Sequence, residues 1–154
     1  MRDLDRPLLE VGKKRTKKII DFLLENNVRP GLIISSTALR SKETAGYIAR
    51  GLAYPANEIL FDPSLYEAKD GTLSNFFYDL SDKYDSVMIV GHNPALTNFV
   101  NQFTAEDFDF LPTSGVVCID FDTEKWELIH SSPFHVNFVV YPKMLSKAKP
   151  AGLS

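Results

Sequence analysis

The stretch SVMIVGHNP, residues 86–94, decides the fold class of this sequence. It opens with a strand predicted over residues 86–90, whose continuous apolar run is typical of a parallel strand covered on both faces. Gly91 then permits a tight backbone path, and Pro94 suits the first turn of a helix, which we expect to extend to about Phe103. The stretch therefore predicts a buried strand that leads directly into a helix.

The same alternation of strand and helix extends towards the N-terminus. Apolar spacing and chain breakers predict helices over residues 8–26, 38–50 and 72–80, and strands over 32–35 and 58–61. After residue 103 the pattern changes, and three strands joined by short turns are expected over 116–121, 126–130 and 136–141. The sequence thus predicts one three-layer α/β/α domain over residues 1–146, with a mostly parallel sheet, an antiparallel C-terminal portion and a flexible tail over 147–154.

Composition restricts the class of protein. The net charge of −3 argues against a nucleic-acid-binding protein, which usually carries a basic surface. Cys118 is the single cysteine, so an internal disulfide is excluded, and its apolar neighbours predict a buried structural thiol. No apolar stretch is long enough to span a membrane and the charged N-terminus lacks a signal core, so we expect a cytoplasmic protein.

Two strand-to-helix junctions, residues 35–40 and 91–94, indicate a binding site. In α/β sheets, ligands bind beyond the carboxyl ends of the strands, and helix N-termini favour anions there. One junction carries Arg40, whose guanidinium matches phosphate oxygens, and the other carries His92. Together they predict a phosphate site, although a structural histidine and a surface arginine are the alternatives for these residues taken singly.

Other polar residues could have either a functional or a structural role. Glu67 lies in an expected loop, where its carboxyl could protonate a leaving group or activate water, or could simply be solvated. His130 and His135 are expected to be structural, and no spacing of histidines or carboxylates predicts a metal site. The basic run over residues 13–18 predicts a solvated helix face, or alternatively an attractant for an acidic partner.

Taken together and in order, these segments resemble the histidine phosphatase superfamily, the branch that includes phosphoglycerate mutases. The short SixA-like phosphohistidine phosphatases are the most similar group. The resemblance covers residues 3–141 and is carried by five segments: DRPL (residues 5–8) followed by Gly12, SSTALRSKETA (35–45), LYEA (65–68), VGHNP (90–94) and LPTSGV (111–116).

The resemblance implies a phosphoglycerate mutase-like fold and a phosphatase that acts on phosphohistidine in proteins through a phosphohistidine enzyme intermediate. It implies that Arg40 binds phosphoryl oxygens, that His92 stabilises the transferring phosphoryl group and that Glu67 is the acid/base. No metal and no cofactor are implied. The implied partner is a phosphorylated protein, such as a histidine phosphotransfer domain, because the short insert between Arg40 and His92 leaves little chain for a lid.

One departure from the family pattern concerns the nucleophile. The family begins with an apolar strand that ends in Arg-His-Gly, and this sequence contains no Arg-His pair. We expect a truncated chain or a misassigned start, with a natural relic that binds phosphate without turnover, or an enzyme rebuilt around His92, as alternatives. The chain is therefore predicted to be inactive or impaired, and its exposed strand edges predict dimerisation, edge filling or poor stability.

Two other functions remain open at this point. The first is a non-catalytic module that binds phosphate or a phosphoprotein, which an absent nucleophile would favour. The second is a small-molecule phosphatase or mutase of the same superfamily, although we identify no residues that would position a second phosphate.

Overall fold

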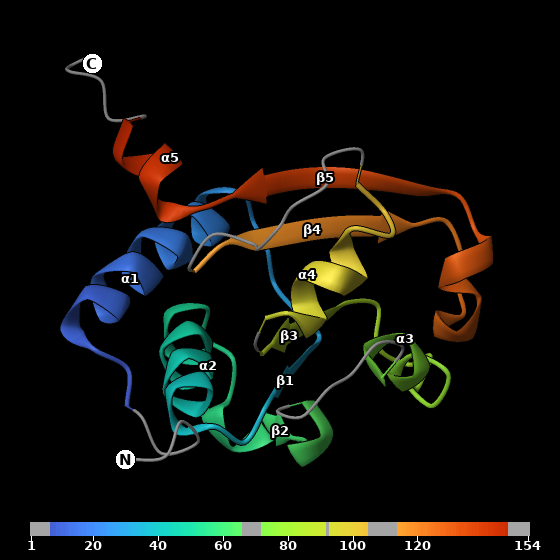
Figure 1. Ribbon diagram of the computed structural model, residues 1–154, viewed down its shortest axis with the longest axis horizontal. Coiled ribbons are helices and arrows are strands. Elements are labelled where there is room, and N and C mark those ends of the chain that lie inside the picture. The colour runs from blue at the N-terminus through green and yellow to red at the C-terminus, as the bar shows by residue number, and fades with distance from the viewer. Residues whose placement is uncertain (1–6, 66–71, 92, 105–113, 148–154) are drawn as a thin grey trace.

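A three-stranded parallel sheet forms the centre of the computed structural model, which describes residues 7–65, 72–91, 93–104 and 114–147 (Figure 1). Strand β1 (Leu32–Ser35) lies between β2 (Leu60–Phe61) and β3 (Val87–Val90). Ile34 of β1 is opposite Ile89 of β3. All four residues of β1 are buried, as expected for an apolar strand in the middle of a covered sheet.

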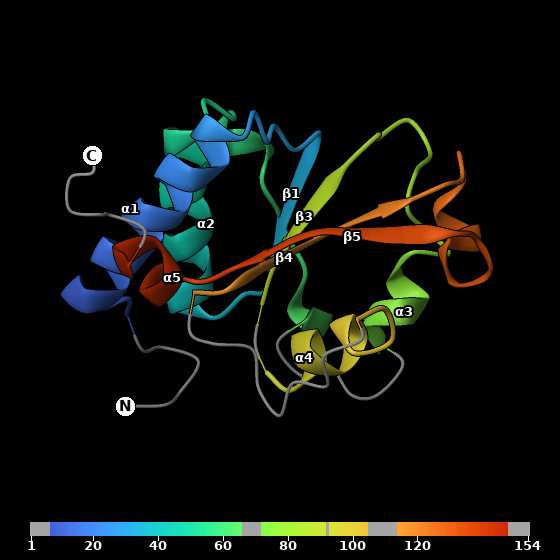
Figure 2. The same ribbon diagram turned by 90° about the horizontal axis from the view of Figure 1, so that it is seen from above.

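Helices cover both faces of this sheet, which confirms the predicted three-layer α/β fold (Figures 1 and 2). On one face, α1 (Glu10–Glu25) and α2 (Leu39–Gly51) pack around Ile33. On the other face, α3 (Thr72–Phe76) and α4 (Ala95–Val100) contribute to a second apolar cluster around Ile34. Successive residues of β1 point to opposite faces, so both clusters are anchored on the same strand.

The helix α1 forms because its buried residues repeat every three or four positions, namely Gly12, Thr16, Ile19 and Leu23. At Gly51, the last residue of α2, an added Cβ would lie 2.5 Å from Cγ2 of Ile20. The missing side chain therefore allows α1 and α2 to approach each other closely. Short 3-10 turns over Ala56–Glu58 and Pro63–Leu65 flank β2.

The C-terminal portion is an antiparallel pair, β4 (Val116–Phe121) and β5 (Phe134–Val140), with a bulge between Cys118 and Ile119. The strand predicted over 126–130 is wrong, because Trp126–Ser131 is a 3-10 helix. Two hydrogen bonds donated by Trp126 hold this segment against the loop before β3. Its backbone N–H donates to the Asp82 carboxylate at 2.9 Å, and its indole Nε1–H donates to the Tyr84 carbonyl at 2.9 Å.

Two helices end earlier than predicted, and one helix was not predicted. The helix expected over 72–80 ends at Phe76, and the helix expected to reach Phe103 ends at Val100, with turns continuing both. A short helix that was not predicted, α5 (Pro142–Lys147), follows β5 and packs against α1. Its first residue is a proline, which suits the start of a helix.

The β4–β5 pair lies between the same two groups of helices as the parallel sheet. On one face, the Phe138 ring contacts Phe22 of α1 edge-on, with centroids 5.1 Å apart. On the other face, the Phe121 ring contacts Phe103, just after α4, at the same centroid distance. Nevertheless β3 and β4 do not pair, and the described strands form two separate sheets. Within the residues described, no helix is both long and apolar enough to cross a membrane.

Candidate functional site

The junction between β1 and α2 is tied to the carboxyl end of β3. The backbone N–H of Ser36 donates to the Val90 carbonyl at 2.9 Å, one residue beyond the point where Ser35 and Val90 are register partners. The two strands therefore end at the same edge, and the segments that follow them, 35–40 and 91–94, leave the sheet there. This is the edge at which ligands bind in open α/β sheets.

Two buried serines build the turn into α2. Ser35 and Ser36 are both 0% exposed. The Ser35 hydroxyl donates to the Ser36 carbonyl at 2.8 Å, and the Ser36 Oγ lies 3.4 Å from the Ala38 N–H, which donates to it. Because these hydroxyls bond the local backbone, they stabilise the tight turn that orients the first turn of α2.

The first turn of α2 is cationic. Arg40 lies there half-buried, Lys42 follows it, and the first turn holds no carboxylate. Helix N-termini carry partial positive charge and usually attract acidic side chains, so this arrangement reverses the common preference. Local reversals of this kind are expected at functional sites, and here the reversal favours a bound anion.

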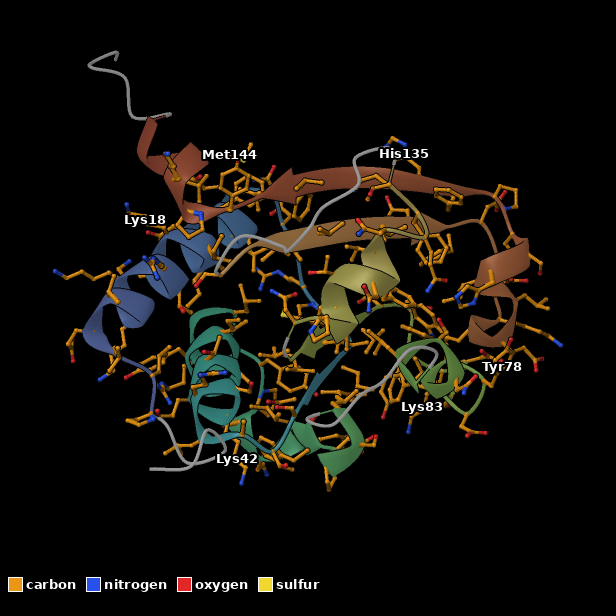
Figure 3. All side chains as sticks on the ribbon, in the orientation of Figure 1. Lys18, Lys42, Tyr78, Lys83, His135 and Met144 are labelled. Atoms are coloured by element: carbon orange, nitrogen blue, oxygen red, sulfur yellow. The ribbon has the colours of Figure 1, made fainter. Side chains whose placement is uncertain are left out.

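Lys42 extends this cationic turn towards β2 (Figure 3). Its Nζ lies 5.6 Å from the centroid of the Phe61 ring, at the end of β2. Sequence reasoning singled out Arg40 but missed Lys42. The signal that could have found it is the pattern of two cations and no acid at the start of a helix that follows a buried strand.

At the second junction, α4 begins at Ala95, with Pro94 as its N-cap rather than in its first turn. The Thr97 hydroxyl, which is 1% exposed, donates to the side-chain oxygen of Asn93. This bond fixes Asn93 against the first turn of α4. His92 and Glu67, the two residues predicted to carry the chemistry, lie outside the described residues, so their roles stay predictions.

The described residues of the two junctions combine one cation, Arg40, with small and hydroxyl-bearing side chains. Among their described residues, 35–40, 91 and 93–97, none carries a thiol or an imidazole. The Ser35 and Ser36 hydroxyls are buried and occupied in backbone bonds. In the part of the chain that the structure describes, no group of three histidine, cysteine or acidic residues could hold a metal ion.

The remaining candidates lie elsewhere in the fold. The His130 ring packs beside Phe103, with centroids 5.4 Å apart, in an aromatic cluster between α4 and the β4–β5 pair. Cys118 is half-buried rather than fully buried, and its burial, with a smaller effect from the Asp120 charge, raises the pKa of its thiol. On α1, Lys17 pairs with Asp21 at 3.2 Å, which is typical of a solvated helix face.

Solved structures of SixA proteins are similar to this chain. A protein assigned as the phosphohistidine phosphatase SixA of Agrobacterium tumefaciens superposes with a TM-score of 0.76 at 27% identity, covering 92% of this chain and 87% of that chain. The protein histidine phosphatase SixA complexed with tungstate gives a TM-score of 0.77 at 22% identity, covering 94% and 89%. A protein assigned as SixA of Nakamurella multipartitia gives 0.74 at 16% identity, covering 92% and 88%.

Sequence comparison is less specific. An uncharacterized chloroplastic protein of Arabidopsis thaliana is 32% identical over 101 residues, covering 60% of this chain and 46% of that protein. This chain therefore spans less than half the length of that relative. No family model matches the sequence. The structural likeness thus supports the SixA-like fold and the resemblance to histidine phosphatases.

Proposed function

We propose that this chain forms the phosphate-binding part of a phosphohistidine phosphatase that acts on proteins. The observation that carries the proposal is the cationic first turn of α2, with Arg40 and no carboxylate, at the carboxyl edge of a parallel sheet. The similarity to SixA structures supports it, and one of those proteins holds tungstate, an oxyanion of the same charge and shape as phosphate. In this proposal Arg40 binds the phosphoryl oxygens, because a guanidinium offers donors in a fixed fork.

The reaction proceeds in two displacements. A histidine nucleophile of the enzyme attacks phosphorus, the P–N bond of the substrate phosphohistidine breaks, and the leaving imidazole takes a proton. Water then attacks the phosphorylated enzyme, which releases phosphate and regenerates the imidazole. His92 stabilises the transferring phosphoryl group and Glu67 is the acid/base that moves the proton. In the family the nucleophile is the histidine of an Arg-His pair, and this sequence contains no such pair. In this proposal the chain alone is therefore inactive or impaired.

A non-catalytic phosphate-binding or phosphoprotein-binding module is the second candidate. It is favoured by the buried and occupied hydroxyls of Ser35 and Ser36, which leave Arg40 as the main anion-binding side chain described at this edge. A phosphoprotein-binding module would share the phosphorylated protein partner of the first candidate and would differ from it only in turnover. The cytoplasm remains the proposed location, and the related Arabidopsis protein is chloroplastic.

Oxyanion binding tests the phosphate site directly. We expect calorimetric titration with tungstate to show one site, and Arg40→Gln to weaken its affinity by about 10- to 100-fold, because a hydrogen bond to a charged group contributes about 1.5–3 kcal/mol. Lys125→Gln removes one cation on the β4–β5 connection, far along the chain from this edge, and is the matched control. A wild-type chain that binds no tungstate, or an Arg40→Gln variant that binds it unchanged, would contradict the proposal.

Activity separates the two candidates. Release of phosphate from a phosphohistidine protein should be absent or weak for this chain and should appear in a form extended upstream with the Arg-His segment. If this chain is active by itself and His92→Ala abolishes the activity, then His92 is the nucleophile and the assignment of the missing residue is wrong. If the extended form binds tungstate but releases no phosphate, then the binding module is the correct function.

A further inference from the structure

Three strand ends form a row across the carboxyl edge of the parallel sheet. Ser35 of β1 is the register partner of Val90 in β3 on one side and of Phe61 in β2 on the other. The Asp62 backbone N–H donates to the Ser35 carbonyl at 2.9 Å, so β2 stays paired with β1 up to this edge. Phe61 therefore lies one strand spacing, about 5 Å, from the start of the turn that leads to Arg40.

Phe61 is an exposed aromatic residue beside this turn. Its side chain is 45% exposed and points to the α2 side of the sheet, since the Lys42 Nζ lies 5.6 Å from the centroid of its ring. Leu39, three positions before Lys42 and therefore its neighbour on the surface of α2, is 38% exposed. We call these three residues, Leu39, Lys42 and Phe61, the β2 rim. Exposed apolar side chains that gather beside a binding site indicate contact with a ligand or another protein.

The β2 rim carries one positive charge. Figure 3 shows the Lys42 side chain directed outwards from the start of α2. Backbone N–H groups hold the two carboxylates that are nearest in the sequence to the rim. Oε1 of Glu43 accepts from the Leu8 N–H at 2.7 Å, and Oδ1 of Asp62 accepts from the Ser64 N–H at 3.0 Å. The rim thus presents an ammonium group beside two apolar surfaces.

The position of the rim decides which ligand it fits. Val90, where the second junction begins, is two strand spacings, about 10 Å, from Phe61. An extended peptide covers this distance in about three residues, whereas an inorganic anion at the junctions does not reach the rim. A single lysine beside apolar side chains suits one carboxylate and one apolar side chain rather than a polyanion. The rim therefore fits polypeptide that lies next to a phosphorylated residue.

We propose that the β2 rim binds the segment that flanks the phosphohistidine of a protein substrate, and that it selects an apolar residue and a carboxylate within about three residues of the phosphohistidine. This inference rests on the proposed function, because it takes Arg40 as the residue that binds the phosphoryl oxygens. It adds a basis for choosing among phosphorylated proteins, which the phosphoryl group common to all of them does not provide. It applies equally to a phosphatase and to a binding module, so its tests measure binding and not turnover.

Peptides that contain phosphonotriazolylalanine, a stable analogue of phosphohistidine, are the probes. The reference peptide has glutamate two positions and leucine three positions from the analogue on both sides, so that the direction of binding does not matter. Two comparison peptides replace glutamate by glutamine or leucine by serine. In titrations followed by fluorescence anisotropy, we expect the reference peptide to bind about 3-fold more tightly than the glutamine peptide, as for an exposed ion pair, and about 10-fold more tightly than the serine peptide.

Substitutions in the rim should remove these preferences one at a time. Lys42→Gln should abolish the preference for glutamate over glutamine, and Phe61→Ser should abolish the preference for leucine over serine, whereas Phe61→Leu should keep most of it. Tyr78→Ser is the matched control, because Tyr78 is an exposed aromatic residue that Figure 3 places away from Lys42, and it should keep both preferences. Each preference is a ratio of two Kd values for the same variant, so a partial loss of folded protein does not change it.

The outcomes separate this inference from the proposed function. A wild-type chain that binds tungstate but binds none of the peptides, or binds all three equally, would overturn the inference alone. Preferences that persist in both Lys42→Gln and Phe61→Ser would do the same. A chain that binds no tungstate, and binds the reference peptide equally with and without its phosphono group, would contradict the phosphate site and the inference with it.

Discussion

A pair of matched substitutions in the parallel sheet tests whether β3 has an open edge. Ile34 and Ile89 are the same residue type, they lie opposite each other on adjacent strands, and they pack into the same apolar cluster. Ile34 is 2% exposed, in the middle of the sheet, whereas Ile89 is half-buried on a strand whose other edge pairs with no described strand. Replacement of each by alanine removes the same atoms, so the difference in the free energy of unfolding reports the surroundings.

Fully buried isoleucine or leucine replaced by alanine costs about 2–5 kcal/mol, part of which comes from the cavity that remains. We expect Ile34→Ala to cost about 4 kcal/mol, because β2, β3 and both helix layers hold the cavity open. We expect Ile89→Ala to cost about 2 kcal/mol, because a strand with one free edge can collapse towards the lost volume and less burial is lost. The twofold difference should be readily measured.

Urea unfolding supplies the assay, followed by far-UV circular dichroism and by the fluorescence of Trp126, the single tryptophan. The slope of the free energy of unfolding against urea concentration should be the same in both variants, so that a shift in the urea midpoint reports a change in stability alone. Equal costs for the two variants, within about 0.5 kcal/mol, would refute the argument for an open edge.

Three further predictions concern packing and titration. Gly51→Ala should destabilise the chain by about 1–3 kcal/mol, because its Cβ would meet Ile20, whereas the control Gly46→Ala, with an ordinary contact, should stabilise it by about 0.5–1 kcal/mol in thermal unfolding. Trp126→Phe should cost about 1 kcal/mol in the same assay, because it removes the indole bond to a backbone carbonyl. Burial raises the pKa of Cys118, so at pH 8.5 iodoacetamide should react at least about 10-fold more slowly with the native chain than with the unfolded chain. The pKa of the Cys118 thiol is higher in the folded chain than in the unfolded chain. The stability linked to this thiol should therefore be fully present below its ordinary pKa and should be lost as the pH rises through the raised pKa. Urea midpoints measured as a function of pH would check this direction.

The parallel sheet was predictable because its strands carry signals of more than one kind. The runs that form β1 and β3 are continuously apolar, lie between chain breakers and are followed by helices. Their hydrophobic pattern, their length and their flanking segments therefore all indicate buried parallel strands. Helix ends were less predictable. The apolar residues beyond Phe76 and Val100 continue the helical spacing, but in the structure they pack from turns rather than from helices.

The strand expected over 126–130 shows where local pattern fails. The segment begins with an aromatic residue and is rich in apolar residues, yet only Ile129 among its residues is buried. Distant groups decide its conformation, since the carboxylate of Asp82 and the carbonyl of Tyr84 each accept a hydrogen bond from Trp126. No reading of residues 126–130 alone includes partners more than forty positions earlier, and tertiary contacts commonly override propensity in this way.

For the site, the strand-to-helix junctions predicted the edge of the sheet, and the structure places Arg40 there, in the first turn of α2. The role of Arg40 stays a prediction. Sequence reasoning did not single out Lys42, since a single lysine on an amphipathic helix is ordinarily a solvated residue. The roles of His92 and Glu67 rest on the family resemblance and remain predictions. The sequence also predicted exposed strand edges, and among the described strands β3 pairs only with β1 and β4 only with β5.

The attachment of the β4–β5 pair has a consequence for partial unfolding. Among the described residues, side chains and not ladder hydrogen bonds join this pair to the parallel sheet. They are the Phe138 ring on the α1 side and the rings around Phe103 on the α4 side. Side-chain packing weakens gradually as elements separate, whereas a shared ladder would make the two sheets open together. We therefore expect local opening to begin in this pair, and the 122–125 turn at its far end to become accessible to proteases before the strands of the parallel sheet do.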